Sequence, residues 1–359
     1  MEDEQQADSA FAFTGDWREF APIAFTNLLL TIVTLGIYRF WATTRERRYL
    51  WSRTRFIDDR LEWTGTGLEL FIGFLLVFAL LLGPLLFLQF GLQAMIMRGY
   101  EGAAFAITAV VYLFILYLVG VAVFRALRYR LSRTYWHGIR GGSDEQGWIY
   151  GLIHLAFSFA SGMTLGLIVP FSMTTRWNYR WSAMSFGPHK FDATAKAGPI
   201  FGRFLLFYLI PILIVILLVV GFVTGAIGER MSPSSAGGAA FAVAFVIAIL
   251  LFYVVTGLIA LMFYSAYYRE AVGALRLSDL SFAFTARSKD WFLLILGNIA
   301  LVIVTLGIGI IFLRYRNWKF FITHLEASGE INLDRLTQSA TREPGQGEGL
   351  LDAFDVGAI

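Results

Sequence analysis

No cysteine occurs among the 359 residues, and only 15% of them are charged. The absence of cysteine excludes disulfide bonds, thiolate metal sites and cysteine nucleophiles. The scarcity of charge excludes an ordinary soluble domain, in which roughly a quarter of the residues are charged. Apolar sequence is abundant instead: 57% of the residues are hydrophobic, and several apolar runs reach the roughly 20 residues that a helix needs to cross a bilayer. We therefore expect a polytopic membrane protein.

Acidic residues and lysine are also missing from the apolar segments, which we place at 20–42, 70–97, 103–124, 148–173, 204–227, 239–264 and 291–313. Proton- and ion-coupled pumps usually need buried carboxylates or charge pairs, so this absence disfavours an energised transporter. The chain has no P-loop motif and no G-x-S-x-G motif. Its four histidines fit no metal spacing. We expect no enzyme activity, no catalytic residues, no metal and no cofactor.

An internal repeat organises the chain. The sequence FAFT at 11–14 recurs at 282–285, and in the same register the stretch 11–49 matches 282–320 without a gap. A weaker third copy lies between these two. Each copy has an apolar helix, a Thr-Leu-Gly break and a basic aromatic segment. We predict copies near 11–67, 141–198 and 282–330, with these residues at or before the breaks: Asn27, Thr34, Gly36, Thr164, Gly166, Asn298, Thr305 and Gly307.

The copies leave two topologies open, because the positive-inside rule places Lys and Arg in cytoplasmic loops. If every apolar segment crosses, the basic stretches at 172–199 and 265–290 lie on the wrong side of the membrane. The copies are then inverted, as in inverted-repeat transporters. If each copy enters, turns at its break and returns, nearly all basic residues and the C-terminus face the cytoplasm. We favour this re-entrant arrangement, which leaves four crossings at 70–97, 103–124, 204–227 and 239–264.

The first copy combines Asn27, Thr31, the sequence Thr34-Leu35-Gly36-Ile37-Tyr38, Trp41 and a basic tail at 45–49. In these features it resembles the YjgN family of bacterial inner-membrane proteins, and the resemblance covers most of 11–330. The chain departs from the family pattern at Arg39-Phe40, where a small residue and proline are usual. The resemblance implies a multi-pass protein of the bacterial inner membrane. It implies no chemistry, because the family is a domain of unknown function.

The basic aromatic segments are the most distinctive polar feature. Their arginines share a helical face while tryptophan and tyrosine are spaced to lie among headgroups, a pattern typical of interfacial anchors. Arginine also binds phosphate through two parallel hydrogen bonds, so the segments are candidate sites for anionic lipid headgroups at the cytoplasmic face. Anchoring alone is the simpler interpretation. The candidate contacts are Arg45, Arg48, Tyr49, Trp51, Arg176, Arg180, Trp181, Arg314, Arg316 and Trp318.

Alternating apolar and polar residues predict short strands at 56–65 and 186–194. Together with the two FAFT segments, these strands are expected to form a small cytoplasmic sheet. Asp58, Asp59 and Glu62 form a carboxylate cluster in the first of them. Without matching histidines, this cluster fits a solvated loop better than a metal site.

The predicted fold is an all-α polytopic membrane protein, a helical bundle with three internal repeats and a small cytoplasmic β element. An acidic tail (1–10) precedes the membrane domain (11–330), and a flexible tail (331–359) follows it. Two function classes remain. The first is non-energised passage or handling of a lipid-like or uncharged small molecule in a Thr- and Asn-lined space between the copies. We prefer it, because threefold repetition more naturally builds a cavity than a docking face. The second is a non-catalytic scaffold or regulator of an envelope partner protein; neither class involves nucleic acid.

Overall fold

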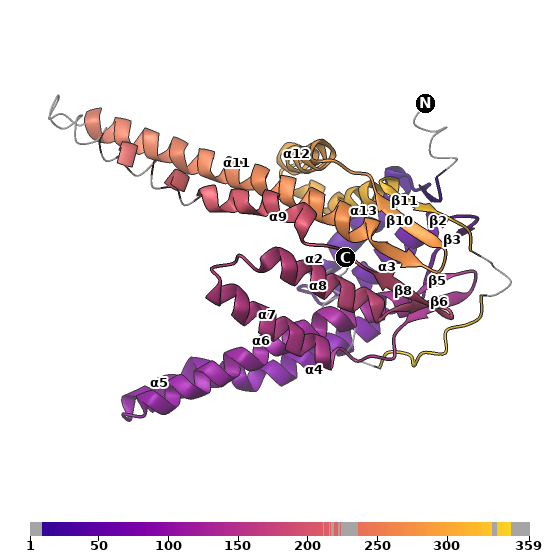
Figure 1. The fold of residues 1–359 in the computed structure, drawn as a ribbon, viewed down its shortest axis with the longest axis horizontal. Coiled ribbons are helices and arrows are strands. Elements are labelled where there is room, and N and C mark those ends of the chain that lie inside the picture. Colours follow the sequence, from indigo (N-terminus) through magenta and orange to yellow (C-terminus); the bar gives the residue numbers. More distant parts are fainter. Residues whose placement is uncertain are drawn as a thin grey trace.

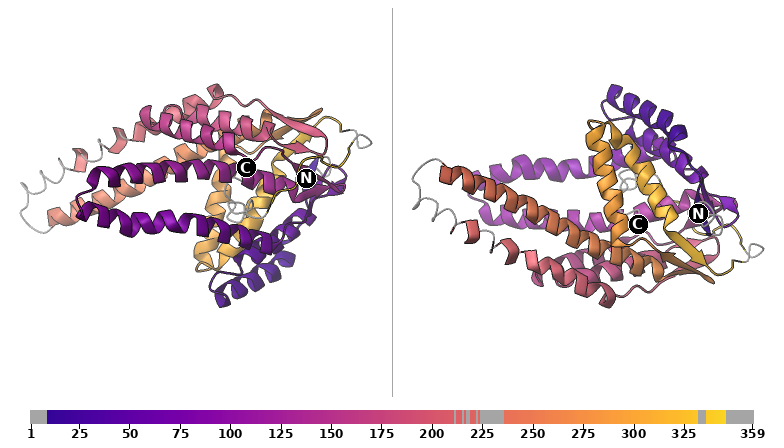
Figure 2. Two further views of the ribbon diagram at one scale, coloured as in Figure 1. Left: turned by 90° about the horizontal axis from the view of Figure 1, so that it is seen from below. Right: turned by 90° about the horizontal axis from the view of Figure 1, so that it is seen from above.

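Two long helical arms project in the same direction from a region of short strands (Figure 1). The computed structural model describes residues 9–210, 212–214, 216, 219–221, 223, 236–331 and 336–345, without the side chains of 236–242 and 244. The strands and both ends of the described chain lie together at the base of the arms (Figures 1 and 2).

Within these described residues, four helices are long and apolar enough to cross a membrane: Gly67–Met97, Glu101–Ser132, Gly198–Gly221 and Phe245–Gly273. They correspond to the four segments that the re-entrant topology predicts to cross. Each contains a long apolar stretch of which only 6–17% is buried within the protein, as expected for a helix that faces lipid. The first arm contains α4 (Gly67–Leu86), the π-helix η1 (Phe87–Gly91), α5 (Leu92–Met97) and α6 (Glu101–Ser132), and the second contains α9 (Gly198–Phe204), the 3-10 helix η2 (Leu205–Tyr208) and α11 (Ala236–Gly273).

Three shorter helical hairpins surround the base of the arms, and two of them run across the arms (Figure 2). Their first helices have only 16 or 17 residues, which is about 25 Å at 1.5 Å per residue and less than the roughly 30 Å hydrocarbon core. The hairpins are α2 (Trp17–Val33) with α3 (Arg39–Ser52), α7 (Trp148–Met163) with α8 (Val169–Ser182), and α12 (Ser288–Val304) with the 3-10 helix η3 (Ile308–Phe312) and α13 (Leu313–Thr323).

Each hairpin turns back at its Thr-Leu-Gly sequence with nearly the same backbone. The leucines have φ of 50–51° and the glycines φ of 89–94°. Glycine adopts this left-handed conformation without a Cβ penalty, which explains its position at the end of a helix. In all three turns the threonine hydroxyl donates to the carbonyl four residues earlier, at 2.6–2.8 Å. The chain therefore reverses direction where the sequence predicts a break.

The prediction of an all-α fold is wrong in one respect, because the base of the arms carries antiparallel sheets. An eight-stranded sheet forms a half-barrel in which the strands follow in chain order, β4 to β11. A three-stranded sheet has the order β1-β2-β3. The two predicted strand regions and both FAFT segments do form strands. The strands are β1 (Phe11–Phe13), β2 (Thr54–Phe56), β3 (Asp59–Arg60), β4 (Glu62–Trp63), β5 (Thr134–Trp136), β6 (Ile139–Gly142), β7 (Ser185–Phe186), β8 (His189–Ala193), β9 (Leu275–Leu277), β10 (Leu280–Phe284) and β11 (Leu325–Ser328).

Aromatic contacts join the small sheet to the half-barrel. The ring of Phe11 on β1 lies 6.4 Å from that of Phe282 on β10, and the ring of Phe56 on β2 lies 4.9 Å from that of Trp136 on β5. The Trp136 indole also donates to the Phe56 carbonyl at 2.9 Å. The small sheet therefore bridges two distant parts of the large one.

Part of the predicted C-terminal tail is placed against the half-barrel. The buried side chain of Arg140 on β6 donates to the carbonyl of Thr341, and its backbone N–H donates to the Gln338 side chain at 3.1 Å. Residues 336–345 thus lie along β5 and β6, while 332–335 and 346–359 fall outside the described residues. The predicted acidic tail also falls outside them, except for residues 9 and 10.

Candidate functional site

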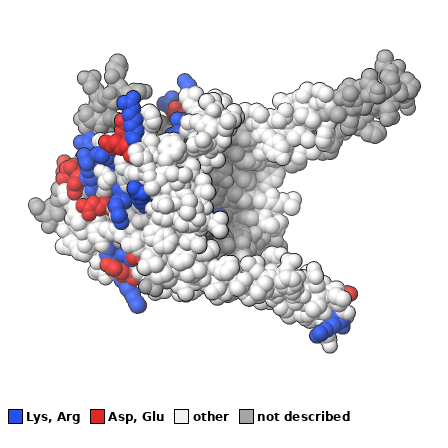
Figure 3. Space-filling view, turned by 180° about the vertical axis from the view of Figure 1, so that it is seen from behind, with Lys and Arg blue, Asp and Glu red and all other residues white. Residues whose placement is uncertain are grey.

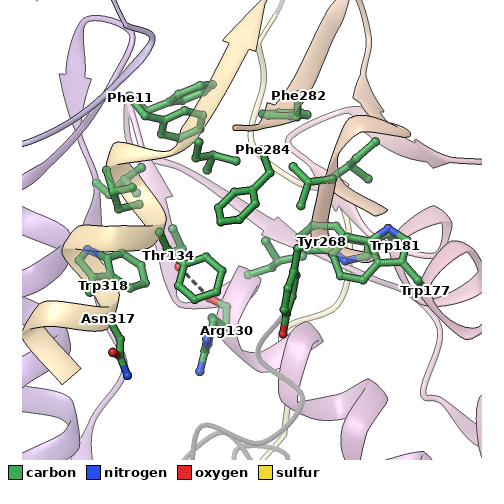
Figure 4. Close-up of a pocket in the computed structure, with 18 of the residues that line it drawn as sticks. Phe11, Arg130, Thr134, Trp177, Trp181, Tyr268, Phe282, Phe284, Asn317 and Trp318 are labelled. Atoms are coloured by element: carbon green, nitrogen blue, oxygen red, sulfur yellow. Dashed lines mark hydrogen bonds between the residues drawn. The ribbon is translucent and has the colours of Figure 1, made fainter. Parts of the chain in front are cut away.

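A cavity of about 1060 Å³ lies under the half-barrel. Binding sites for small molecules usually measure about 300–1,000 Å³, so this cavity is large for one. Figure 3 shows the hollow that the two arms leave between them, with charged side chains gathered over the base of the arms. Figure 4 shows the cavity itself, with aromatic side chains from helices and strands on all sides.

Four helices line the cavity with pairs of residues four positions apart, and a fifth such pair spans the end of α6 and the start of β5. Residues at i and i+4 lie on one face of a helix, so each helical pair points the same way. The second residue of each pair lies one turn nearer the sheet. The pairs are Arg47 and Trp51 from α3, Arg130 and Thr134 from α6 and β5, Trp177 and Trp181 from α8, Tyr264 and Tyr268 from α11, and Arg314 and Trp318 from α13.

The concave face of the half-barrel supplies the apolar roof. Successive residues of a strand point to opposite faces, and β9 shows the consequence clearly. Leu275 and Leu277 are buried and line the cavity, whereas Arg276 between them is exposed on the outer face. Phe282 and Phe284 of β10 complete the roof in the same manner (Figure 4).

Stacked indole rings join two hairpins at one wall. The rings of Trp51 and Trp318 lie 4.0 Å apart and nearly parallel. The Trp51 indole donates to Thr134 Oγ1 and the Trp318 indole to Thr54 Oγ1, both at 2.9 Å. These bonds satisfy both buried donors, so this wall is held in place without a ligand.

Across the described part of the lining, the charged residues are all arginines, and each is involved in contacts of its own. The guanidinium of Arg47 lies 4.9 Å from the centre of the Trp63 ring. Arg314 Nη1 lies 2.8 Å from Glu46 Oε2, and both side chains are largely buried. The Asn27 amide also donates to Glu46, at 3.2 Å. Arg130 is partly buried.

At its far end from the sheet, the cavity follows the apolar stretch of α11. Gly257, Ala260 and Leu261 line it there, together with Ile295 of α12. From Gly257 to Val272 the helix rises about 22 Å. The same cavity therefore reaches from the strands to the level of the apolar arms.

The predicted headgroup residues divide into two groups. Four of them line the cavity: Trp51, Trp181, Arg314 and Trp318. The other six lie elsewhere. Arg45 and Arg48 are exposed on α3. Arg180 is buried, with its guanidinium 5.8 Å from the centre of the Trp177 ring.

The remaining three form bonds inside or beside their own hairpins. Arg176 bonds to the ring Nδ1 of His154 at 2.8 Å, and Arg316 donates to Asn298 Oδ1 at 2.7 Å. The Tyr49 hydroxyl donates to Glu19 at 3.1 Å. Burial and this bond raise the pKa of Tyr49 to about 12.

The predicted break residues lie away from the cavity. Thr34, Gly36, Thr164, Gly166, Thr305 and Gly307 form the tips of the hairpins. Asn27 and Asn298 do not cap these turns. The Asn27 amide donates to the carbonyl of Ala42 on the returning helix at 3.3 Å, and that of Asn298 donates to Asn317 at 2.9 Å.

Within the described residues, no group of three or more His, Asp or Glu side chains is arranged to hold a metal ion. The Asp58 carboxylate bonds to the ring of His137 at 2.9 Å in an exposed loop. This bond lowers the pKa of Asp58.

A family model described as "Bacterial protein of unknown function (DUF898)" matches residues 8–353. The chain belongs to the DUF898 family. Two relatives carry the name "Inner membrane protein YjgN". The protein from Salmonella typhimurium is 28% identical over 141 residues, which cover 38% of this chain and 33% of the relative. The protein from Escherichia coli is 36% identical over 63 residues, which cover 18% of this chain and 16% of the relative.

These alignments span a third or less of the length of the relatives. No solved structure matches the chain. The family match and the two relatives support the YjgN resemblance, and their name together with four long apolar helices supports an inner-membrane location.

The sequence analysis missed several residues that line the cavity, chiefly Arg47, Arg130, Trp177, Tyr268 and Trp291. A signal for most of them was present. Pairs of arginine or aromatic residues four positions apart recur near the ends of the helices that precede the strands. The signal was obscured because neighbouring arginines, such as Arg45 and Arg48, occur in the same segments and point outward.

Proposed function

We propose that this protein binds a lipid-like amphipathic molecule in the cavity under the half-barrel, without catalysis and without internal energy coupling. The observation that carries the proposal is the continuity of the cavity. One space is lined by leucine and glycine of a membrane-spanning helix at one end and by aromatic rings under the sheet at the other. A molecule from the bilayer can reach this space while its apolar part stays out of water.

The lining chemistry supports an amphipathic rather than a purely polar ligand. Apolar and aromatic residues make up most of it, with a small number of polar side chains between them. Binding sites for small molecules commonly have this composition, in which the polar groups set the orientation. Burial of apolar ligand surface supplies about 25 cal/mol per Å². The lining differs from the predicted Thr- and Asn-lined space, since its described residues include one threonine and one asparagine, Thr134 and Asn317.

We also propose that the three hairpins are copies of one repeated unit. The equal turn geometry and the common register of the first and third copies support this. We further propose that the hairpins are re-entrant, that the sheets and the C-terminus are cytoplasmic, and that the protein is multi-pass. The gathering of charged side chains at the base of the arms supports this orientation under the positive-inside rule (Figure 3).

A blocked cavity tests the proposal. Gly257 lines the cavity, and a Cβ added there meets no atom within 4 Å. Gly257→Trp therefore places an indole in the cavity without a backbone clash. Gly202→Trp on α9 is the matched control, because its added Cβ also meets nothing within 4 Å and the residue does not line the cavity.

The readout is native mass spectrometry of the protein purified in mild detergent, followed by lipid extraction. The wild type and Gly202→Trp are expected to retain a stoichiometric amphiphile, and Gly257→Trp is expected to lose it while remaining folded. Equal amphiphile content in all three proteins would contradict the proposal. Loss of a co-purifying protein from the variant, with no change in lipid, would favour the scaffold alternative.

A further inference from the structure

The described lining of the cavity carries charge of one sign, which is positive. Its charged side chains are Arg47, Arg130 and Arg314, and the described lining residues include no Asp, Glu or Lys. Glu46 lies outside the lining and compensates Arg314 at 2.8 Å. A cleft lined by charge of one sign attracts the opposite charge, and low-dielectric walls strengthen the attraction. The arginines of this lining therefore favour an anionic occupant.

Polar groups of three helices gather at one level of the cavity. In Figure 4 the Arg130 guanidinium, the Asn317 amide and the Tyr268 hydroxyl extend to the same side, away from Phe282 and Phe284. They come from α6, α13 and α11 respectively. All three can donate hydrogen bonds. Asn317 Oδ1 already accepts a bond from Asn298 at 2.9 Å, which leaves the Asn317 N–H groups as its contribution to the cavity.

Resting on the proposed function, we infer that the ligand is an anionic phospholipid whose phosphate lies beside Arg130, Tyr268 and Asn317. Its acyl chains occupy the apolar remainder of the cavity. Arginine suits the role because its planar fork matches two phosphate oxygens at once. We assign the phosphate contact to Arg130, and not to Arg47 or Arg314, because its guanidinium extends to the same side as the other two donors (Figure 4). This places the lipid-binding arginine on α6, outside the three repeated basic segments.

Removal of one charge from inside or outside the cavity tests this inference. Arg130→Gln removes the charge that lines the cavity. Arg276→Gln removes an equal charge from β9, where the side chain points to the outer face while Leu275 and Leu277 line the cavity. Delipidated protein in neutral detergent is titrated with phosphatidylglycerol or phosphatidylcholine of identical acyl chains, and binding is followed by native mass spectrometry.

We expect the wild type and Arg276→Gln to bind phosphatidylglycerol at least tenfold more tightly than phosphatidylcholine. Arg130→Gln is expected to lose most of that preference. Binding of both lipids weakens because both carry the phosphate, and phosphatidylglycerol binding weakens more because the quaternary ammonium of phosphatidylcholine already opposes the attraction of the arginine. Asn317→Asp provides a second variant in case Arg130→Gln does not fold. The new carboxylate keeps the bond from Asn298, and it is expected to weaken phosphatidylglycerol binding selectively by repulsion.

The outcomes separate the two proposals. If neither phospholipid binds the wild type, or if Gly257→Trp binds as well as the wild type, the proposed function itself fails. If both phospholipids bind the wild type equally, the cavity is a lipid site and the inferred anionic preference is wrong. The inference is also overturned if Arg130→Gln and Asn317→Asp both retain the preference that Arg276→Gln retains.

Discussion

Gly120 on α6 and Gly151 on α7 allow the second hairpin to pack closely against the first arm. A Cβ added at Gly120 would lie 2.6 Å from His154 Cβ and 2.9 Å from Gly151 Cα. Carbon atoms are normally about 3.5–4.0 Å apart, so Gly120→Ala must push the two helices apart by roughly 1 Å. Overpacking of this size costs about 1–3 kcal/mol. Small residues at close helix contacts are typical of membrane bundles.

Gly202 on α9 provides the control, because it lies inside the helix Gly198–Gly221 and a Cβ there meets nothing within 4 Å. Gly→Ala in a helix gains up to about 1 kcal/mol from propensity, and this gain is common to both variants. The free energy of unfolding of Gly120→Ala should therefore fall about 1–3 kcal/mol below that of Gly202→Ala. Titration of the detergent-solubilised proteins with dodecyl sulfate, followed by circular dichroism, measures the difference. Equal stability of the two variants would refute the close contact between α6 and α7.

Two further predictions concern orientation and pH. Met97 lies exposed at the tip of the first arm, and Ser52 is exposed beside the small sheet. In intact cells a membrane-impermeant thiol reagent should therefore label Met97→Cys but not Ser52→Cys. The opposite labelling pattern would contradict the proposed orientation. The pKa of Tyr49 is raised to about 12 by burial and by its bond to Glu19. The neutral hydroxyl therefore stabilises the fold fully below pH 10, and this stabilisation is lost as the pH rises toward 12 and the hydroxyl ionises. Tyr49→Phe should abolish that part of the alkaline stability loss, and an unchanged pH profile would contradict the assigned bond.

The arms and turns were predictable because local sequence determines them. Twenty or more apolar residues form a helix wherever lipid surrounds them. Gly36 and Gly307 follow a helix at a position that needs positive φ, which few other residues adopt at low cost. Neither inference needs knowledge of the rest of the molecule.

The half-barrel was underestimated because its strands have only two to five residues. Alternation is readable at 56–65 and 186–194, whereas a strand such as β9, with three residues, is too short to show a period. These strands form because neighbouring chain segments pair with them. For example, Phe191 on β8 pairs with Leu277 on β9. Such pairing depends on tertiary arrangement, which dominates β propensity.

The cavity was only partly predictable for a related reason. The basic aromatic composition of the helix ends singled out Trp51, Trp181 and Trp318 as candidate headgroup contacts, and these three residues line the cavity. It gave no means of distinguishing Arg45, which is exposed, from Arg47, which is 1% exposed and lines the cavity. Positions two residues apart on a helix differ by about 200° in direction. Only the packing against the sheet shows which direction is inward.

Photocrosslinking tests the central claim, a lipid-filled cavity under the half-barrel, most directly. A phospholipid with a diazirine on its acyl chain is reconstituted with the protein, and labelled residues are identified by peptide mass spectrometry. Lipid in the cavity should label Phe191, Leu277 and Phe284, which line the roof on strands β8, β9 and β10. Lipid around the arms cannot reach these residues. Labels confined to the exposed faces of the arms, with none under the sheet, would contradict the account.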